Sequence, residues 1–147
     1  MTTEWEFGQE AEQELVGTLV SVSPSRTLSA IDLLNGWKTH IARLTVESAS
    51  ISIQESLTWG ADDLVAALHL RDLTEQAAER LSSQTQIEFR HRIDNIDDDF
   101  RKFTESDQMD LLSGWIHEPV SKSWWWHRIP RFGPIIDELR SSQTGRS

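Results

Sequence analysis

The stretch that decides the fold is Phe89-Arg90-His91-Arg92-Ile93-Asp94-Asn95-Ile96-Asp97-Asp98-Asp99-Phe100-Arg101-Lys102-Phe103. Its apolar residues are separated alternately by four and three positions, and almost all residues between them are charged. This spacing brings the apolar residues onto one face, because an α-helix has about 3.6 residues per turn. The pattern predicts a helix from Gln86 to Thr104 that packs in a helical bundle.

Four further segments have helical signals. Ser29 with Asp32 three residues later is typical of a helix start, and apolar residues follow at helical spacing as far as Leu44. Another helix is expected over residues 61–81, with an apolar stripe formed by Ala66, Leu70, Leu73, Ala77 and Leu81. A short helix is expected over residues 109–116. A last one is expected from Gly133-Pro134 to Arg140, since proline suits the first helical position.

Two segments are ambiguous. Residues 9–22 favour a helix, although the run from Leu15 to Val22 is also rich in strand-forming residues. Residues 46–58 either extend the preceding helix or form a short strand pair. We therefore predict an all-α, single-domain bundle of about five or six helices, with a short strand pair near residues 46–58 as the alternative. The expected division is a polar N-terminal arm at 1–14, a helical domain at 15–140 and a disordered tail at 141–147.

Charge is the most informative bulk property of the 147-residue chain, whose net charge is −10. Residues 1–119 carry 9 basic and 22 acidic side chains, whereas residues 120–147 carry 5 and 2. The acidic body would repel phosphate backbones and anionic lipids, so we expect neither direct nucleic-acid binding nor membrane binding. It would attract a basic protein partner. The chain has no cysteine and no secretory signal pattern, so a cytoplasmic location is expected.

Motifs for catalysis and cofactors are weak. The chain lacks a nucleophile elbow and phosphate-binding glycine loops, so we predict no catalytic residues and no cofactor, and lean against an enzyme. Glu88-x-x-His91 is half of a di-iron pattern, but no second Glu-x-x-His occurs. The run from Asp94 lacks the glycine that a calcium loop needs at its sixth position. We therefore predict no metal site; the alternative is a bundle enzyme with a metal site built around His91 and Asp94.

The tryptophan run at 124–126 is the second unusual stretch, because a histidine and two arginines follow it closely. Three adjacent tryptophans cannot all bury against one surface. We interpret the run as a clasp that holds the last helix to the bundle, with its arginines paired to the acidic body. The alternative is a hook for a partner, since Trp and Arg are enriched at binding hot spots. The candidate partner-binding residues are Asp94, Asp97, Asp98, Asp99, Trp124, Trp125, Trp126, His127, Arg128 and Arg131.

These observations favour a non-enzymatic acidic binding protein, of the inhibitor, antitoxin or immunity type, that docks a basic protein. Two alternatives remain from other classes. One is the metal-dependent bundle enzyme. The other is an oligomeric scaffold subunit, such as a homodimer, in which exposed tryptophans form the self-interface.

Overall fold

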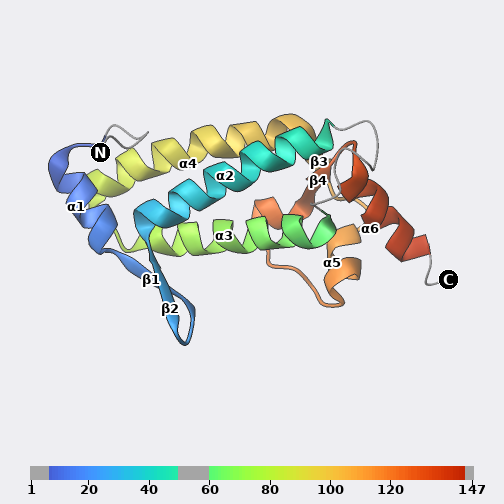
Figure 1. Ribbon diagram of the computed structural model, residues 1–147, viewed down its shortest axis with the longest axis horizontal. Helices are drawn as coiled ribbons and strands as arrows, with labels where there is room; N and C mark the ends of the chain where they lie inside the picture. The colour runs from blue at the N-terminus through green and yellow to red at the C-terminus, as the bar shows by residue number, and fades with distance from the viewer. Residues whose placement is uncertain (1–6, 50–59, 145–147) are drawn as a thin grey trace.

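Three long helices form the body of the molecule in a computed structural model that describes residues 7–49 and 60–144. They are α2 (Ala30–Ser48), α3 (Ala61–Glu79) and α4 (Ser83–Phe103), which lie side by side (Figure 1). Ser29 caps α2, because its hydroxyl accepts a hydrogen bond from the amide of Asp32 at 3.2 Å. Within the described residues the chain forms six α-helices, so the predicted all-α bundle is confirmed.

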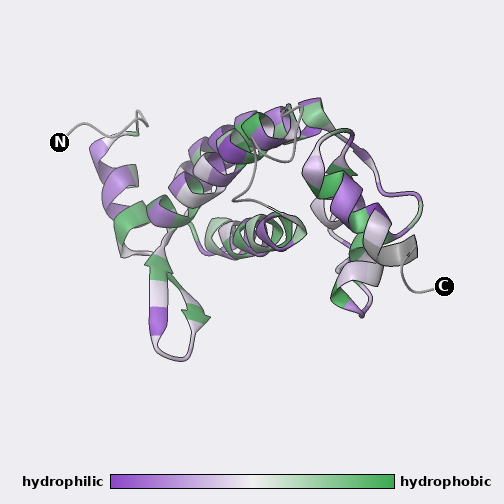
Figure 2. Ribbon diagram, turned by 45° about the vertical axis from the view of Figure 1, so that its right-hand side comes forward, coloured by the Kyte–Doolittle hydropathy of each residue, from purple (hydrophilic) through white to green (hydrophobic). Residues whose placement is uncertain are grey.

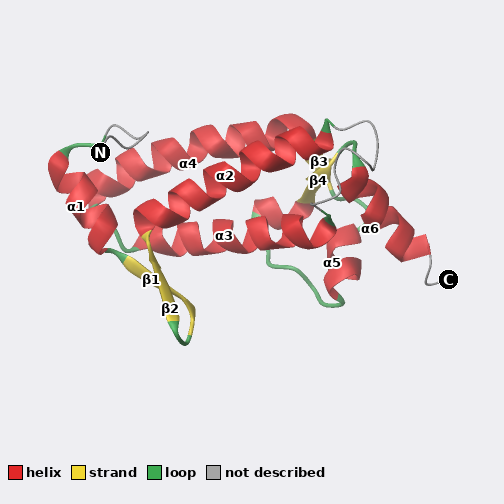
Figure 3. Cartoon of the chain, viewed as in Figure 1, coloured by secondary structure: helices red, strands yellow, loops and turns green. Residues whose placement is uncertain are grey.

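At one end of the bundle, α1 (Gln9–Gly17) is followed by a β-hairpin that projects from the body (Figure 3). The hairpin consists of β1 (Leu19–Ser23) and β2 (Arg26–Ser29), which are antiparallel. The helix expected over residues 9–22 is therefore right only as far as Gly17. Beyond it, alternating strand-forming residues and a turn at Pro24 favour the hairpin. The segment expected to be a polar arm is helical from Gln9 onward.

At the other end, short elements return the chain to the end of α4. These are β3 (Thr104–Ser106), α5 (Leu111–Ile116), the 3₁₀ helix η2 (Trp124–His127), β4 (Arg128–Pro130) and α6 (Pro134–Thr144). Strand β4 pairs antiparallel with β3. Gly133 has a φ of 98°, and a Cβ there would lie 2.9 Å from the Cα of Ser48. A glycine is therefore needed where α6 turns against the end of α2.

The strand pair considered near residues 46–58 is not found where the structure describes that range. Val46 to Ser48 complete α2, Ala49 is its C-cap, and residues 50–58 lie outside the described part. In the described residues, one strand pair lies at 19–23 and 26–29 and the other at 104–106 and 128–130. Strands β3 and β4 have three residues each, which is too short for an alternating pattern to reveal them.

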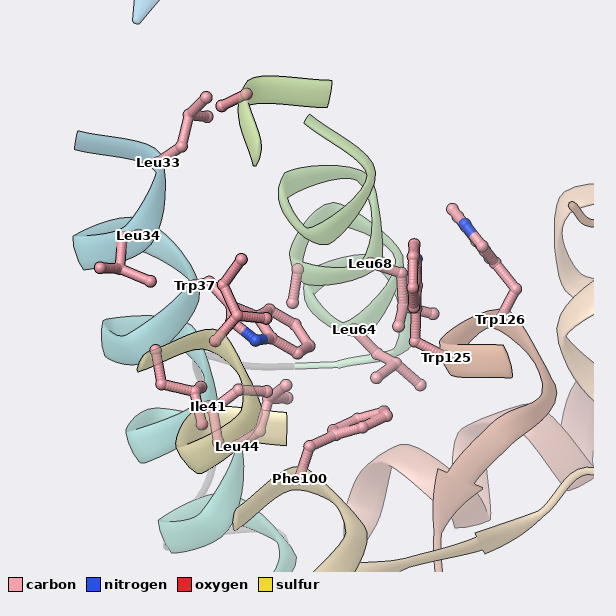
Figure 4. Packing of buried hydrophobic residues seen from close by; sticks show 14 of the residues in the cluster. Leu33, Leu34, Trp37, Ile41, Leu44, Leu64, Leu68, Phe100, Trp125 and Trp126 are labelled. Carbon is pink, nitrogen blue, oxygen red and sulfur yellow. The ribbon is translucent and has the colours of Figure 1, made fainter. Parts of the chain in front are cut away.

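The core lies between the three long helices, along which hydrophobic and hydrophilic residues alternate (Figure 2). Trp37 of α2 and Phe100 of α4 are fully buried there, as Figure 4 shows. Most of the predicted apolar face of α4 is confirmed, since all its members but the half-buried Phe103 are buried. None of the described helices combines the length and apolarity that a membrane span requires.

The predicted stripe of α3 is wrong at one of its five positions, because Ala77 and Leu81 belong to the core and Leu70 and Leu73 pack against it. Ala66 is exposed, and Leu70 and Leu73 are half-buried. The core face instead includes Arg71 and Thr74, which are buried. Polar residues on the core face shift the apolar stripe, and hydrogen bonds make their burial tolerable.

Candidate functional site

The outer face of α4 carries exposed carboxylates, as the charge pattern predicted. Asp94, Asp98 and Asp99 are exposed. Asp98 binds Arg101 at 3.0 Å, and Asp99 binds Lys102 at 3.1 Å, so charge is balanced toward the end of the helix. In the first part of α4, Glu88 and Asp94 are likewise matched in number by Arg90 and Arg92. The excess negative charge therefore lies on the neighbouring α1, which carries Glu10, Glu12 and Glu14 and no basic residue.

An acidic groove of about 480 Å³ lies between α1 and the start of α4. Its lining includes three glutamates, Glu10, Glu14 and Glu88. Glu14 accepts hydrogen bonds from the Ser82 amide at 2.6 Å and the Ser82 hydroxyl at 2.7 Å. These bonds lower the pKa of Glu14, because they stabilise its charged carboxylate.

We define the acidic surface as Glu10 and Glu14 of α1 together with Glu88, Asp94 and Asp98 of α4. These side chains are exposed or half-buried. Ile87 precedes Glu88 in the chain and keeps 66% of its surface exposed. The surface thus offers an exposed apolar side chain next to a carboxylate that lines the groove, and interfaces combine apolar contacts with a polar rim.

Asp97 does not belong to this surface, which corrects its place among the candidate contacts. Its side chain is buried and binds Arg71 of α3 through two hydrogen bonds of 3.0 Å. The indole N–H of Trp37 donates a third, also at 3.0 Å. Burial raises the pKa of Asp97, and the Arg71 guanidinium opposes that rise. Asp97 therefore joins α2, α3 and α4 inside the molecule and is not presented to a partner.

The hydrogen-bond network of Arg71 and Asp97 extends toward the surface through Glu75. Arg71 donates to Glu75 at 3.0 Å, and Arg90 of α4 binds the same carboxylate at 2.9 and 3.2 Å. Arg71 and Glu75 are four residues apart on α3, a spacing at which oppositely charged side chains can pair on a helix. Burial works against the charge of Glu75, but hydrogen bonds and charge from Arg90 and Arg71 together outweigh it and lower its pKa.

The tryptophan run forms η2, and it is largely inside the molecule. Trp125 and Trp126 are buried, with 5% and 2% of their surfaces exposed. Both indole N–H groups donate to Asp72 of α3, at 2.8 Å from Trp125 and 3.0 Å from Trp126. The guanidinium of Arg71 lies 4.0 Å from the centre of the Trp125 ring. These contacts are those of a clasp, and the two residues are not available as partner contacts.

Trp124 differs from its neighbours because it is half-buried. Its ring lies 6.2 Å from Phe100 on its inner side and 4.0 Å from the guanidinium of Arg101. His127 is half-buried, and its Nε2 lies 2.8 Å from the carbonyl of Ser121. The scaffold alternative assumed a run of exposed tryptophans, so it loses its structural basis here.

Arg128 and Arg131 were expected to pair with acidic side chains, and this expectation is wrong. Arg128 donates to the Thr104 carbonyl at 2.8 Å, and Arg131 donates to the Lys102 carbonyl at 2.7 Å. Burial, followed by the nearby charges of Arg101 and Arg131, lowers the pKa of Arg128. The arginines therefore cap the end of α4, where a helix leaves carbonyl groups without helical partners.

Metal ligands are not assembled in the part of the chain that is described. There, no three His, Asp or Glu side chains are close enough to hold a metal ion. His91 and Asp94 are both exposed on α4. Sequence reasoning missed Asp72 and the contact between Arg71 and Asp97, because nothing in a sequence pairs residues on different helices. A comparison of the chain with family models, curated proteins and solved structures finds no match.

Proposed function

We propose that this protein is a non-enzymatic binding protein, of the inhibitor or immunity type, that docks a basic protein partner in the cytoplasm. The docking region is the acidic surface of α1 and α4. The observation that carries the proposal is the groove lined by Glu10, Glu14 and Glu88, with the exposed Ile87 next to Glu88 in the chain. An apolar anchor gives affinity, while the surrounding charge speeds encounter and selects a basic partner.

Two features of the acidic surface support this proposal over a merely solvated helix face. Glu14 is held in place by Ser82, so less side-chain conformational entropy is lost when a partner binds. Glu10, Glu14 and Glu88 come from two helices but line one groove. Negative charge thus gathers at one place and is not spread evenly.

The proposal is tested by Asp94→Lys/Asp98→Lys. The immobilised chain would be incubated with host lysate at low and at raised salt, and captured proteins would be identified by mass spectrometry. We expect a basic protein that binds wild type in a salt-sensitive way to be lost with the variant, and to be weakened by Ile87→Ser. Both positions are exposed, so the fold should survive; circular dichroism checks this.

The matched control is Glu118→Lys/Asp137→Lys, which makes the same change of charge at exposed positions away from the acidic surface. It should retain the partner. Equal loss with both double variants would mean that net charge alone governs capture. Unchanged capture by Asp94→Lys/Asp98→Lys would exclude the acidic surface.

A further inference from the structure

A second groove lies on a different part of the molecule, between the C-terminal halves of α2 and α4. Figure 1 shows these two helices side by side. Its volume is about 750 Å³, within the range of small-molecule sites. Ile41 and Ala42 of α2 line it together with Ile96 and Phe103 of α4. Phe132, which follows β4, also lines the groove and keeps 72% of its surface exposed. The groove is therefore mainly apolar, with an aromatic ring at its edge.

Basic side chains contribute to the same lining. They are Lys38 of α2, Lys102 of α4 and Arg131 after β4, against a single acidic lining residue, Asp99. Lys102 binds Asp99 at 3.1 Å, and Arg131 is oriented by its bond to the Lys102 carbonyl. The groove thus has a positive edge in a molecule whose net charge is −10.

We propose that this groove binds a small anionic amphiphile, a molecule with an apolar body and one carboxylate or similar head group. The apolar body would pack between α2 and α4 against Phe132. The head group would lie at the positive edge, where Arg131 and Lys102 are placed to receive it. Charge complementarity selects this occupant, because a cationic amphiphile would meet two or more like charges there.

Isothermal titration of the full chain with dodecanoate and dodecyltrimethylammonium, both below micelle-forming concentrations, tests the proposal. The two probes share an alkyl chain and differ in the sign of the head group. The net charge of the protein favours the cation, so non-specific binding and groove binding predict opposite preferences. We expect dodecanoate to bind once per chain, and dodecyltrimethylammonium to bind at least about tenfold more weakly.

Three variants locate the binding. Lys102→Glu/Arg131→Glu should weaken dodecanoate by about tenfold or more. Phe132→Ser should also weaken dodecanoate binding, without altering the charge of the groove. This variant tests the site if Lys102→Glu/Arg131→Glu does not fold. Arg26→Glu/Lys122→Glu makes the same charge change at exposed positions elsewhere and should leave binding unchanged. Tighter binding of dodecyltrimethylammonium than of dodecanoate would overturn the proposal. So would an equal loss of dodecanoate binding in Arg26→Glu/Lys122→Glu. Neither result bears on the proposed role of the acidic surface.

Discussion

At the scale of single residues, Arg71 is the side chain on which the bundle converges. It binds Asp97 on α4, contacts Glu75 on its own helix and stacks on Trp125 of η2. Removing two charges from water costs several kcal/mol per ion, which the mutual attraction and extra hydrogen bonds must offset. The ion pair of Arg71 with Asp97 therefore contributes more to the specific arrangement of α3, α4 and η2 than to net stability.

Removal of one partner should be costly, and the two single variants should respond differently to pH. We expect Arg71→Met and Asp97→Asn each to lower the free energy of unfolding by about 3–5 kcal/mol at neutral pH. Arg71→Met leaves a carboxyl group whose pKa is already raised by burial, so protonation can relieve the loss as pH falls. Asp97→Asn leaves a guanidinium that stays charged, so its loss should persist.

The direction of this pH dependence follows from the difference between the pKa of the carboxyl group in the folded and in the unfolded state. A carboxyl group with a folded-state pKa above its unfolded value favours folding at low pH, and that benefit disappears as pH rises through the folded-state pKa. Urea unfolding between about pH 4 and 7 measures both variants against wild type. A deficit of Arg71→Met that stayed constant over this range would show that Asp97 is not left buried and charged.

At the scale of elements, η2 is held to α3 by one carboxylate that serves two buried indoles. Asp72→Ala would leave the N–H groups of Trp125 and Trp126 without their acceptor. We expect a loss of about 2–4 kcal/mol, since each buried unsatisfied donor costs about 1–3 kcal/mol. Thermal unfolding and near-ultraviolet circular dichroism would report the loss of stability and of tryptophan packing.

Asp62→Ala is the matched control, because Asp62 also accepts an indole N–H, from Trp115 at 2.9 Å, but in an exposed setting. Water can replace that partner, so the loss should be about 1 kcal/mol or less. Similar losses in the two variants would mean that burial of the tryptophans does not set the strength of the clasp.

Elements could be predicted from sequence where the signal is local. The face of α4 and the Ser29 cap of α2 follow from helical spacing and from a side chain that bonds its own helix. The face of α3 could not be predicted, because Arg71 is buried by a partner on another helix. For the same reason Asp97 was placed among the exposed acids, whereas its three neighbouring candidates, Asp94, Asp98 and Asp99, are exposed.

At the scale of the whole molecule, positive and negative groups gather at different places. Glu14 of α1 binds the Ser82 amide at the start of α4, while Arg101, Lys102, Arg128 and Arg131 lie at its end. This arrangement agrees with the dipole of α4, whose positive end faces the carboxylates and whose negative end faces the cations. The tertiary structure thus sharpens the charge division of the sequence, because β4 brings Arg128 and Arg131 back to α4.

A net charge of −10 should still oppose folding at low ionic strength, since like charges on the surface repel. Raising NaCl from about 10 mM to about 0.15 M shortens the screening length from about 30 to 8 Å. We expect this to raise Tm by about 3 °C, equivalent to about 1 kcal/mol. Asp94→Lys/Asp98→Lys lowers the excess negative charge and should show a smaller rise. Differential scanning calorimetry at neutral pH measures the change in Tm. A Tm that fell with added salt would show instead that the ion pairs, which screening weakens, outweigh the repulsion between like charges.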